Sequence, residues 1–61
     1  MVTKGQKYRR ADGTLWTVTD RDRNADKIGR GFWLLGQDKA SGVESVYEHH
    51  LATAAEWKRV E

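Results

Sequence analysis

The chain of 61 residues contains no cysteine, so neither a disulfide nor a thiolate metal site can form. It contains no proline, so no predicted strand is interrupted by one. Its longest apolar run, residues 32–35, is far below the roughly 20 residues of a membrane-spanning helix. Lys4 and Lys7 are followed by no apolar stretch, so we expect no signal peptide and no membrane partner. These absences together predict a cytoplasmic protein, because a reducing compartment requires no disulfides.

The short length allows one domain over residues 1–61. A chain of this size buries only about 60% of its unfolded surface, so its stability is marginal. Without disulfides, the stabilisation must come from large side chains or from association with a second copy. The large aromatic residues are Trp16, Trp33, Trp57, Tyr8, Tyr47 and Phe32.

Short clusters of aromatic and β-branched residues alternate with turn-forming residues along the whole chain. Such clusters between Gly, Asp and Asn predict a small all-β barrel. The five predicted strands cover residues 6–10, 15–19, 32–37, 43–47 and 57–60. Alternation with a period of two places Tyr8 inward, and it places Trp16 and Val18 together on one face. Asp12-Gly13 predicts a type I′ hairpin turn.

The third predicted strand is apolar on both faces. Phe32 and Leu34 share one face, whereas Trp33 and Leu35 share the other. The outer face of a one-sheet barrel should be polar, so two outward apolar groups predict a binding surface or a subunit contact. Gly36 within this strand predicts a bend or a bulge.

The Ala-rich stretch 49–55 predicts a single helical or 3₁₀ turn before the last strand at 57–60. The alternative is one continuous helix over residues 48–59, because several apolar positions fall at helical spacing. Trp57 and Val60 lie away from that apolar stripe, which favours a turn followed by a strand.

The elements are marked by the spacing Gly5-x-x-Tyr8, Asp12-Gly13-x-x-Trp16-x-Val18, Val46-Tyr47, Leu51 and Trp57-x-x-Val60. This pattern resembles SH3-like small barrels, and among them small accessory proteins of phages and plasmids. The resemblance extends from Gly5 to Val60, nearly the whole chain. It implies a five-stranded SH3-like barrel with an accessory or regulatory role.

Trp16, Gly42-Val43 and Val46-Tyr47 are also similar to the plasmid-type dihydrofolate reductases, which are SH3-like tetramers with a central pore. The pore motif of that family is Val-Gln-Ile-Tyr. The present chain has Glu44-Ser45-Val46-Tyr47 and therefore lacks the Gln expected to meet the ligand. A tetramer of this kind is the remote alternative.

Residues for catalysis are present but do not form a recognisable motif. Ser41 and Ser45 are near His49 and His50 in the sequence, but their order matches no nucleophile elbow. The two adjacent histidines would point in different directions in a strand or a helix, which argues against a metal site. The aspartates of the stretch 20–30 are expected to be solvated. We therefore predict that the protein is not an enzyme and has no cofactor and no metal site.

The net charge of +2 hides an uneven distribution. Residues 1–30 carry eight basic residues against four aspartates, whereas residues 31–61 carry three basic residues against five acidic ones. A basic half favours a polyanionic partner, whereas interleaved Asp and Arg also suit an ordinary solvated surface. Nucleic-acid binding, to DNA or RNA, needs cations for phosphates and an aromatic face for bases. The residues predicted for that role are Lys7, Arg9, Arg21, Arg23, Lys27, Arg30 and Trp33.

The alternative hypothesis is a protein-interaction module that binds a host protein. Its anchors would be Trp33, Leu35 and Tyr47, because aromatic residues dominate interface hot spots. The arginines would then steer an acidic partner surface towards the module. Trp33 also suits a core or subunit-interface position, and a homo-oligomer is compatible with either hypothesis.

Overall fold

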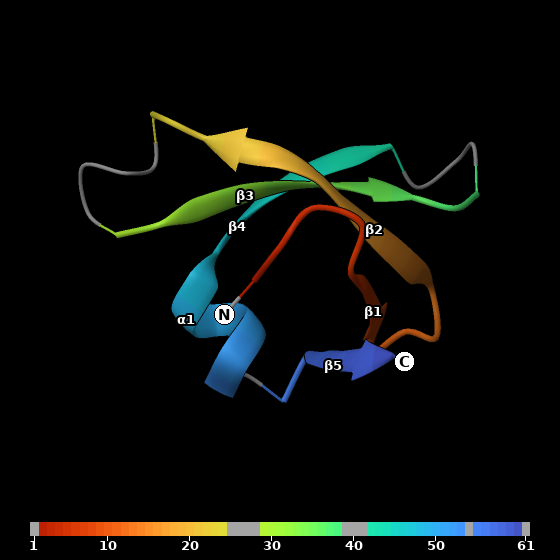
Figure 1. Ribbon diagram of the computed structural model, residues 1–61. Coiled ribbons are helices and arrows are strands. Elements are labelled where there is room, and N and C mark those ends of the chain that lie inside the picture. The colour runs from red at the N-terminus through yellow and green to blue at the C-terminus, as the bar shows by residue number, and fades with distance from the viewer. Residues whose placement is uncertain (1, 25–28, 39–41, 54, 61) are drawn as a thin grey trace.

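The computed structural model describes residues 2–24, 29–38, 42–53 and 55–60. Within these ranges five antiparallel strands form one curled half-barrel sheet, and a short helix precedes the last strand (Figure 1). The elements are β1 (Lys7–Arg10), β2 (Leu15–Asp22), β3 (Gly31–Gly36), β4 (Val43–Tyr47), α1 (Glu48–Thr53) and β5 (Trp57–Val60). The predicted all-β class, with one short helical turn before the fifth strand, is confirmed. The alternative of one continuous helix over 48–59 is wrong, because α1 ends at Thr53 and β5 begins at Trp57.

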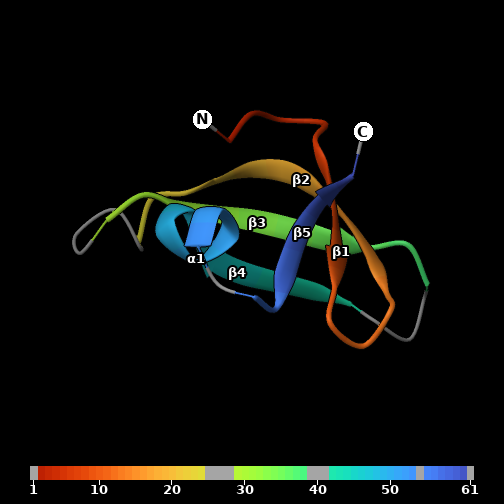
Figure 2. The ribbon, with the colours of Figure 1, turned by 90° about the horizontal axis from the view of Figure 1, so that it is seen from below.

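The strand order is β4-β3-β2-β1-β5, so β4 and β5 form the two edges of the sheet. The sheet curls until β1 and β5 lie across the interior from β3 and β4 (Figures 1 and 2). Helix α1 follows β4 directly and contacts β5, so it covers one side of the gap between the two edges.

The core lies inside this curl. Leu34, Val18 and Trp16 are at most 2% exposed, and Trp57 packs edge-on against Trp16 with ring centroids 5.9 Å apart. The buried apolar residues are Val2, Tyr8, Trp16, Val18, Phe32, Leu34, Leu51 and Trp57. The inward positions predicted from alternation in the first two strands are therefore confirmed.

Arg10 links the first strand to the far edge of the sheet. Its guanidinium carbon lies 5.0 Å from the ring centroid of Trp57 and 5.5 Å from that of Trp16. The same guanidinium donates hydrogen bonds to the carboxylates of Glu44 and Glu56. It therefore connects β1 with β4 and with the residues just before β5, so the two ends of the sheet are joined through side chains.

The turn between β1 and β2 contains three residues. The Arg10 N–H donates to the Thr14 carbonyl at 2.8 Å, and the Gly13 N–H donates to the Arg10 carbonyl at 2.9 Å. Gly13 has a φ of 91°, and no non-glycine residue of the described ranges has a positive φ. A type I′ turn needs positive φ at two consecutive residues, so that prediction is wrong. The geometry is that of a three-residue loop with glycine at the left-handed position.

Strand β2 runs three residues further than predicted, through Asp22 rather than Thr19. Its pairing with β3 shifts between Val18 and Asp20, so Thr19 is the extra residue of a β-bulge. Of the bend or bulge predicted at Gly36, the bulge is wrong, because Gly36 pairs with Trp16 in regular register. The bulge has a direct consequence for the charged residues: beyond Thr19, the side chains that alternation would place outward are placed inward.

A buried carboxylate holds the polar end of β2 in the sheet. Asp22 is 8% exposed and accepts a hydrogen bond from the Ser45 hydroxyl of β4. It also accepts the backbone N–H of Asn24 at 3.1 Å. Gly31 lies between Asp22 and Tyr47 in the register.

Candidate functional site

The outer face of the sheet, the face turned away from the core, carries a group of cations on β1 and β5. Arg9 pairs with Lys58 of β5 on one side and with Leu15 of β2 on the other. Lys7 occupies the next outward position on β1 and pairs with Thr17. Because paired residues of neighbouring strands share a face, Lys7, Arg9 and Lys58 form one outward cluster, which we call the cationic cluster.

The same face is apolar on β3 and β4. Trp33, Leu35 and Val43 are 38%, 48% and 55% exposed. Leu35 pairs with Val43 on one side and with Thr17 on the other, and Thr17 in turn pairs with Lys7. One row of cross-strand neighbours therefore runs from the cationic cluster to the exposed apolar residues, which we call the apolar patch.

The cations of the cluster form no ion pair with a carboxylate of the described residues. Arg10, which points inward, forms ion pairs with Glu44 and Glu56. Lys7, Arg9 and Lys58 take part in none, and Arg9 donates only to the Gly13 carbonyl at 3.4 Å. The outer face thus presents positive charge to solvent along its β1–β5 half.

The bulge turns Arg21 away from this face, and Arg23 lies beyond the last paired residue of β2. Arg21 shares its row with the core residue Phe32 of β3, and it remains exposed because this row lies at the end of the sheet. Arg23 follows the end of β2 and is exposed. The predicted stripe of Lys7, Arg9, Arg21 and Arg23 is therefore not assembled on one face.

The other predicted residues are divided between two regions. Trp33 and Leu35 belong to the apolar patch on the outer face. Arg30 is exposed just before β3 and borders a pocket on the opposite side of the sheet. Tyr47 is half-buried, and its ring stacks on that of His49 with centroids 5.7 Å apart. Lys27 lies outside the described residues.

Sequence reasoning did not identify Lys58 and Val43 as members of the outer face. Alternation along a strand places both of them once the direction of a neighbour is known. Lys58 points outward because its neighbour Trp57 is buried, and Val43 points outward because its neighbour Glu44 faces inward. The register that brings Lys58 beside Arg9 could not be read from the sequence, because it joins the first strand to the last.

The described part of the chain contains no group of three or more His, Asp or Glu residues arranged to hold a metal ion. In the same ranges, no helix has the length and apolar character needed to cross a bilayer. The outer face carries the three cations of the cluster on β1 and β5 and the apolar patch on β3 and β4, where Trp33 is paired with the exposed Asp20 on β2 and with Ser45 on β4.

Comparison with known proteins identified no relative. No protein-family model matches the chain, and neither the curated proteins nor the solved structures contain a significant match.

Proposed function

We propose that the protein is a non-enzymatic module that binds single-stranded nucleic acid through the outer face of its sheet. The observation that carries this proposal is that the cationic cluster, which has no ion pair among the described residues, shares a face with the exposed Trp33. Lysine and arginine attract phosphates by charge, and an exposed indole provides a surface on which a base can stack. Bases of a duplex are already stacked on one another, so a single strand is the better match.

A phosphate contacted by each of the three cations predicts a modest affinity with a defined salt dependence. For single strands each neutralised phosphate contributes about −0.7 to the slope of log K against log salt, so three contacts give about −2. The lack of cysteine suits a cytoplasmic site of action, where nucleic acid is abundant.

Fluorescence anisotropy with labelled DNA and RNA single strands of about 12 nucleotides tests the proposal. We expect binding of both, with affinity falling steeply between about 0.02 and 0.2 M salt. Replacing Lys7 and Arg9 by Ala together should reduce the salt slope by roughly 1.4. Trp33→Ala should weaken binding by about 1–3 kcal/mol, and Trp33→Phe should restore part of the loss.

The matched control is the double replacement of Arg21 and Arg23 by Ala, which removes the same charge from residues outside the outer face. We expect this control to bind within about twofold of the unmodified protein, since distant exposed charges are screened by salt. Equal weakening by the two double variants would show that binding is diffuse and not centred on the outer face. Absence of binding at the lowest salt concentration would exclude the function.

A second candidate function is protein binding, and the apolar patch is the observation that favours it. Trp33, Leu35 and Val43 are exposed together on β3 and the edge strand β4, whose outer edge has no partner strand among the described residues. Leu35→Glu should abolish capture of a host protein, or light-scattering evidence of self-association, without unfolding the domain. Leu35→Ala, which adds no charge beside the cationic cluster, should also weaken protein capture and should leave oligonucleotide binding at low salt within about twofold, which separates the two functions.

A further inference from the structure

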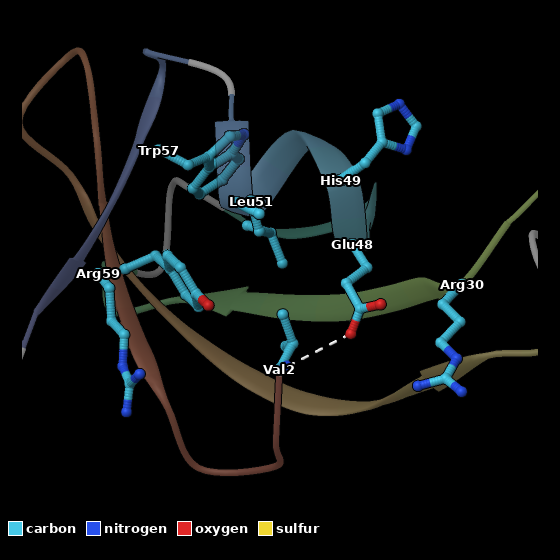
Figure 3. A pocket seen from close by; sticks show the side chains of 9 residues that line it. Val2, Arg30, Glu48, His49, Leu51, Trp57 and Arg59 are labelled. Carbon is cyan, nitrogen blue, oxygen red and sulfur yellow. Dashed lines mark hydrogen bonds between the residues drawn. The ribbon is translucent and has the colours of Figure 1, made fainter.

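A pocket of about 590 Å³ lies on the opposite side of the sheet from the outer face, between the N-terminal segment, α1 and β5 (Figure 3). Its floor consists of Val2, Tyr8, Leu51 and Trp57, each of them at most 8% exposed. The half-barrel leaves this opening because the edge strands β4 and β5 do not pair with each other. Its size is within the range of protein ligand sites.

Two arginines border the pocket from opposite sides. Arg59 projects from β5 at one side, and Arg30 projects from the residue preceding β3 at the other (Figure 3). Both are exposed, and neither forms an ion pair with a residue that the structure describes. The pocket mouth therefore has two cations separated by an apolar floor.

The acidic residue of the lining is already engaged by the backbone. The Glu48 carboxylate accepts the Val2 N–H at 3.4 Å, and the Glu48 N–H donates to the Arg30 carbonyl at 2.6 Å. Glu48 thus ties the N-terminal segment to α1 and to the residue before β3, and neither guanidinium group at the mouth has a carboxylate partner among the described residues. The rim carries a net positive charge.

The floor offers little to a polar ligand. The Tyr8 hydroxyl is directed to the Gln6 side-chain oxygen at 3.4 Å. Burial raises the pKa of Tyr8 above its ordinary value, Arg59 acts in the lowering direction, and Glu48 acts in the raising direction. The hydroxyl is therefore uncharged at neutral pH, and the remaining floor residues are apolar.

We propose that this pocket binds an apolar side chain from an acidic segment of a partner protein, with carboxylates on both sides of that side chain meeting Arg30 and Arg59. The charge of the rim selects an anionic partner, and the apolar floor selects the group that is inserted. A nucleobase would also bring anionic phosphates. Its polar edge would lose water against an apolar floor without gaining equivalent hydrogen bonds, so the peptide is the better match.

NMR titration of the full chain with the capped peptide Glu-Asp-Leu-Asp-Glu tests the proposal. We expect saturable shifts, in the millimolar range, of the Leu51 and Ala52 amides and of the Trp57 indole N–H. The capped peptides Lys-Arg-Leu-Arg-Lys and Glu-Asp-Ala-Asp-Glu should produce much smaller shifts, the first through charge repulsion and the second through loss of the inserted group. Equal shifts from the basic peptide, or no shifts from the acidic one, would overturn the proposal.

Two variants separate the rim from the floor. Replacing Arg30 and Arg59 by Ala together should weaken peptide binding roughly tenfold, because two ion pairs are lost. Ala52→Trp should obstruct the pocket and abolish binding, with thermal unfolding used to verify the fold. The matched control replaces Arg21 and Arg23 by Ala, which removes the same charge from residues that neither line the pocket nor belong to the cationic cluster, and it should bind the peptide within about twofold.

The test also distinguishes the two classes of ligand. An oligonucleotide that shifts the pocket resonances and displaces the peptide would assign the pocket to nucleic acid and overturn the proposal. An oligonucleotide that shifts only outer-face resonances would support it. Failure of the outer face to bind nucleic acid would leave the peptide result unchanged, because the two surfaces share no residue.

Discussion

Arg9 and Arg10 are adjacent in the sequence and have opposite environments. Arg9 is exposed on the outer face, whereas Arg10 points inward, where its guanidinium lies against two tryptophans and meets Glu44 and Glu56. A planar guanidinium can stack on rings and bridge two carboxylates at once, which an ammonium does less well. Arg10 is therefore a structural residue, although the sequence alone counts it with the basic half of the chain.

Arg10→Ala should destabilise the domain by about 2 kcal/mol, the sum of cation–π contacts and partly exposed ion pairs. Arg10→Lys should cost about 1 kcal/mol, since the charge is kept and the planar stacking is lost. Urea denaturation of each variant measures these differences. The control is Arg9→Ala, which we expect to change the free energy of unfolding by less than about 0.5 kcal/mol. Equal effects at the two positions would contradict the structural role of Arg10.

At the scale of elements, the turn between β1 and β2 is held by a carboxylate. The Asp12 side chain accepts the Thr14 hydroxyl and the Thr14 N–H, the latter at 3.0 Å. The Thr14 hydroxyl in turn accepts the Trp16 indole N–H at 2.7 Å. This chain of hydrogen bonds runs from an exposed loop to a core side chain, so protonation of Asp12 affects the hairpin rather than the loop alone.

The hydrogen bonds from the Thr14 side chain and backbone, in that order, hold the pKa of Asp12 below its ordinary value. Because the pKa of Asp12 is lower in the folded state, ionised Asp12 stabilises the fold at every pH above its unfolded-state pKa. That contribution is lost as the pH falls through the folded-state pKa. Asp12→Asn should therefore be less stable than the unmodified protein at pH 6, with the difference shrinking below about pH 4. Chemical denaturation at a series of pH values measures this stability difference. A difference that does not change with pH would contradict the stabilising role of ionised Asp12.

The sequence was sufficient for the elements whose residues alternate cleanly. The bounds of β4 and β5 were predicted correctly, and so were the opposite faces of Phe32 and Trp33. Alternation has a clear apolar signal there, because one face of each strand meets the core. The same signal placed Trp33 and Leu35 on the surface that we propose as the binding face.

The sequence was insufficient where long-range contacts decide the outcome. The end of β2 reads as a polar loop, yet Asp22 stays in the sheet through Ser45, which is distant in the sequence. The bulge at Thr19 depends on the partner strand, and one inserted residue reverses the face of every residue that follows. For this reason Arg21 and Arg23 could not be placed from the sequence, and the cationic cluster gained Lys58 instead.

At the scale of the whole molecule, the curl of the sheet creates two separate positive surfaces. The outer face carries the cationic cluster, and the open side between β4 and β5 carries Arg30 and Arg59 at the pocket. The sheet itself lies between them, and the molecule measures 29 × 22 × 17 Å along its principal axes. Charges separated by the thickness of one sheet are screened at physiological salt, where the Debye length is about 8 Å, but much less at low salt.

Each of the two proposed ligands should therefore weaken the binding of the other only at low ionic strength. An oligonucleotide on the outer face adds negative charge near the pocket. At about 0.01 M salt, where the Debye length is about 30 Å, it should therefore lower the affinity for the acidic peptide severalfold. At about 0.15 M salt the effect should disappear. Thermodynamic reciprocity requires the bound peptide to lower the affinity for the oligonucleotide by the same factor.

Peptide titrations with and without saturating oligonucleotide, at the two salt concentrations, measure this coupling. The control is the variant in which Lys7 and Arg9 are both replaced by Ala, which should lose the antagonism together with oligonucleotide binding. Coupling that persists at the higher salt concentration would show that the ligands compete for one surface or act through a change in the sheet. Salt-sensitive antagonism would place them on opposite sides of a rigid half-barrel, because an electrostatic effect needs no structural change.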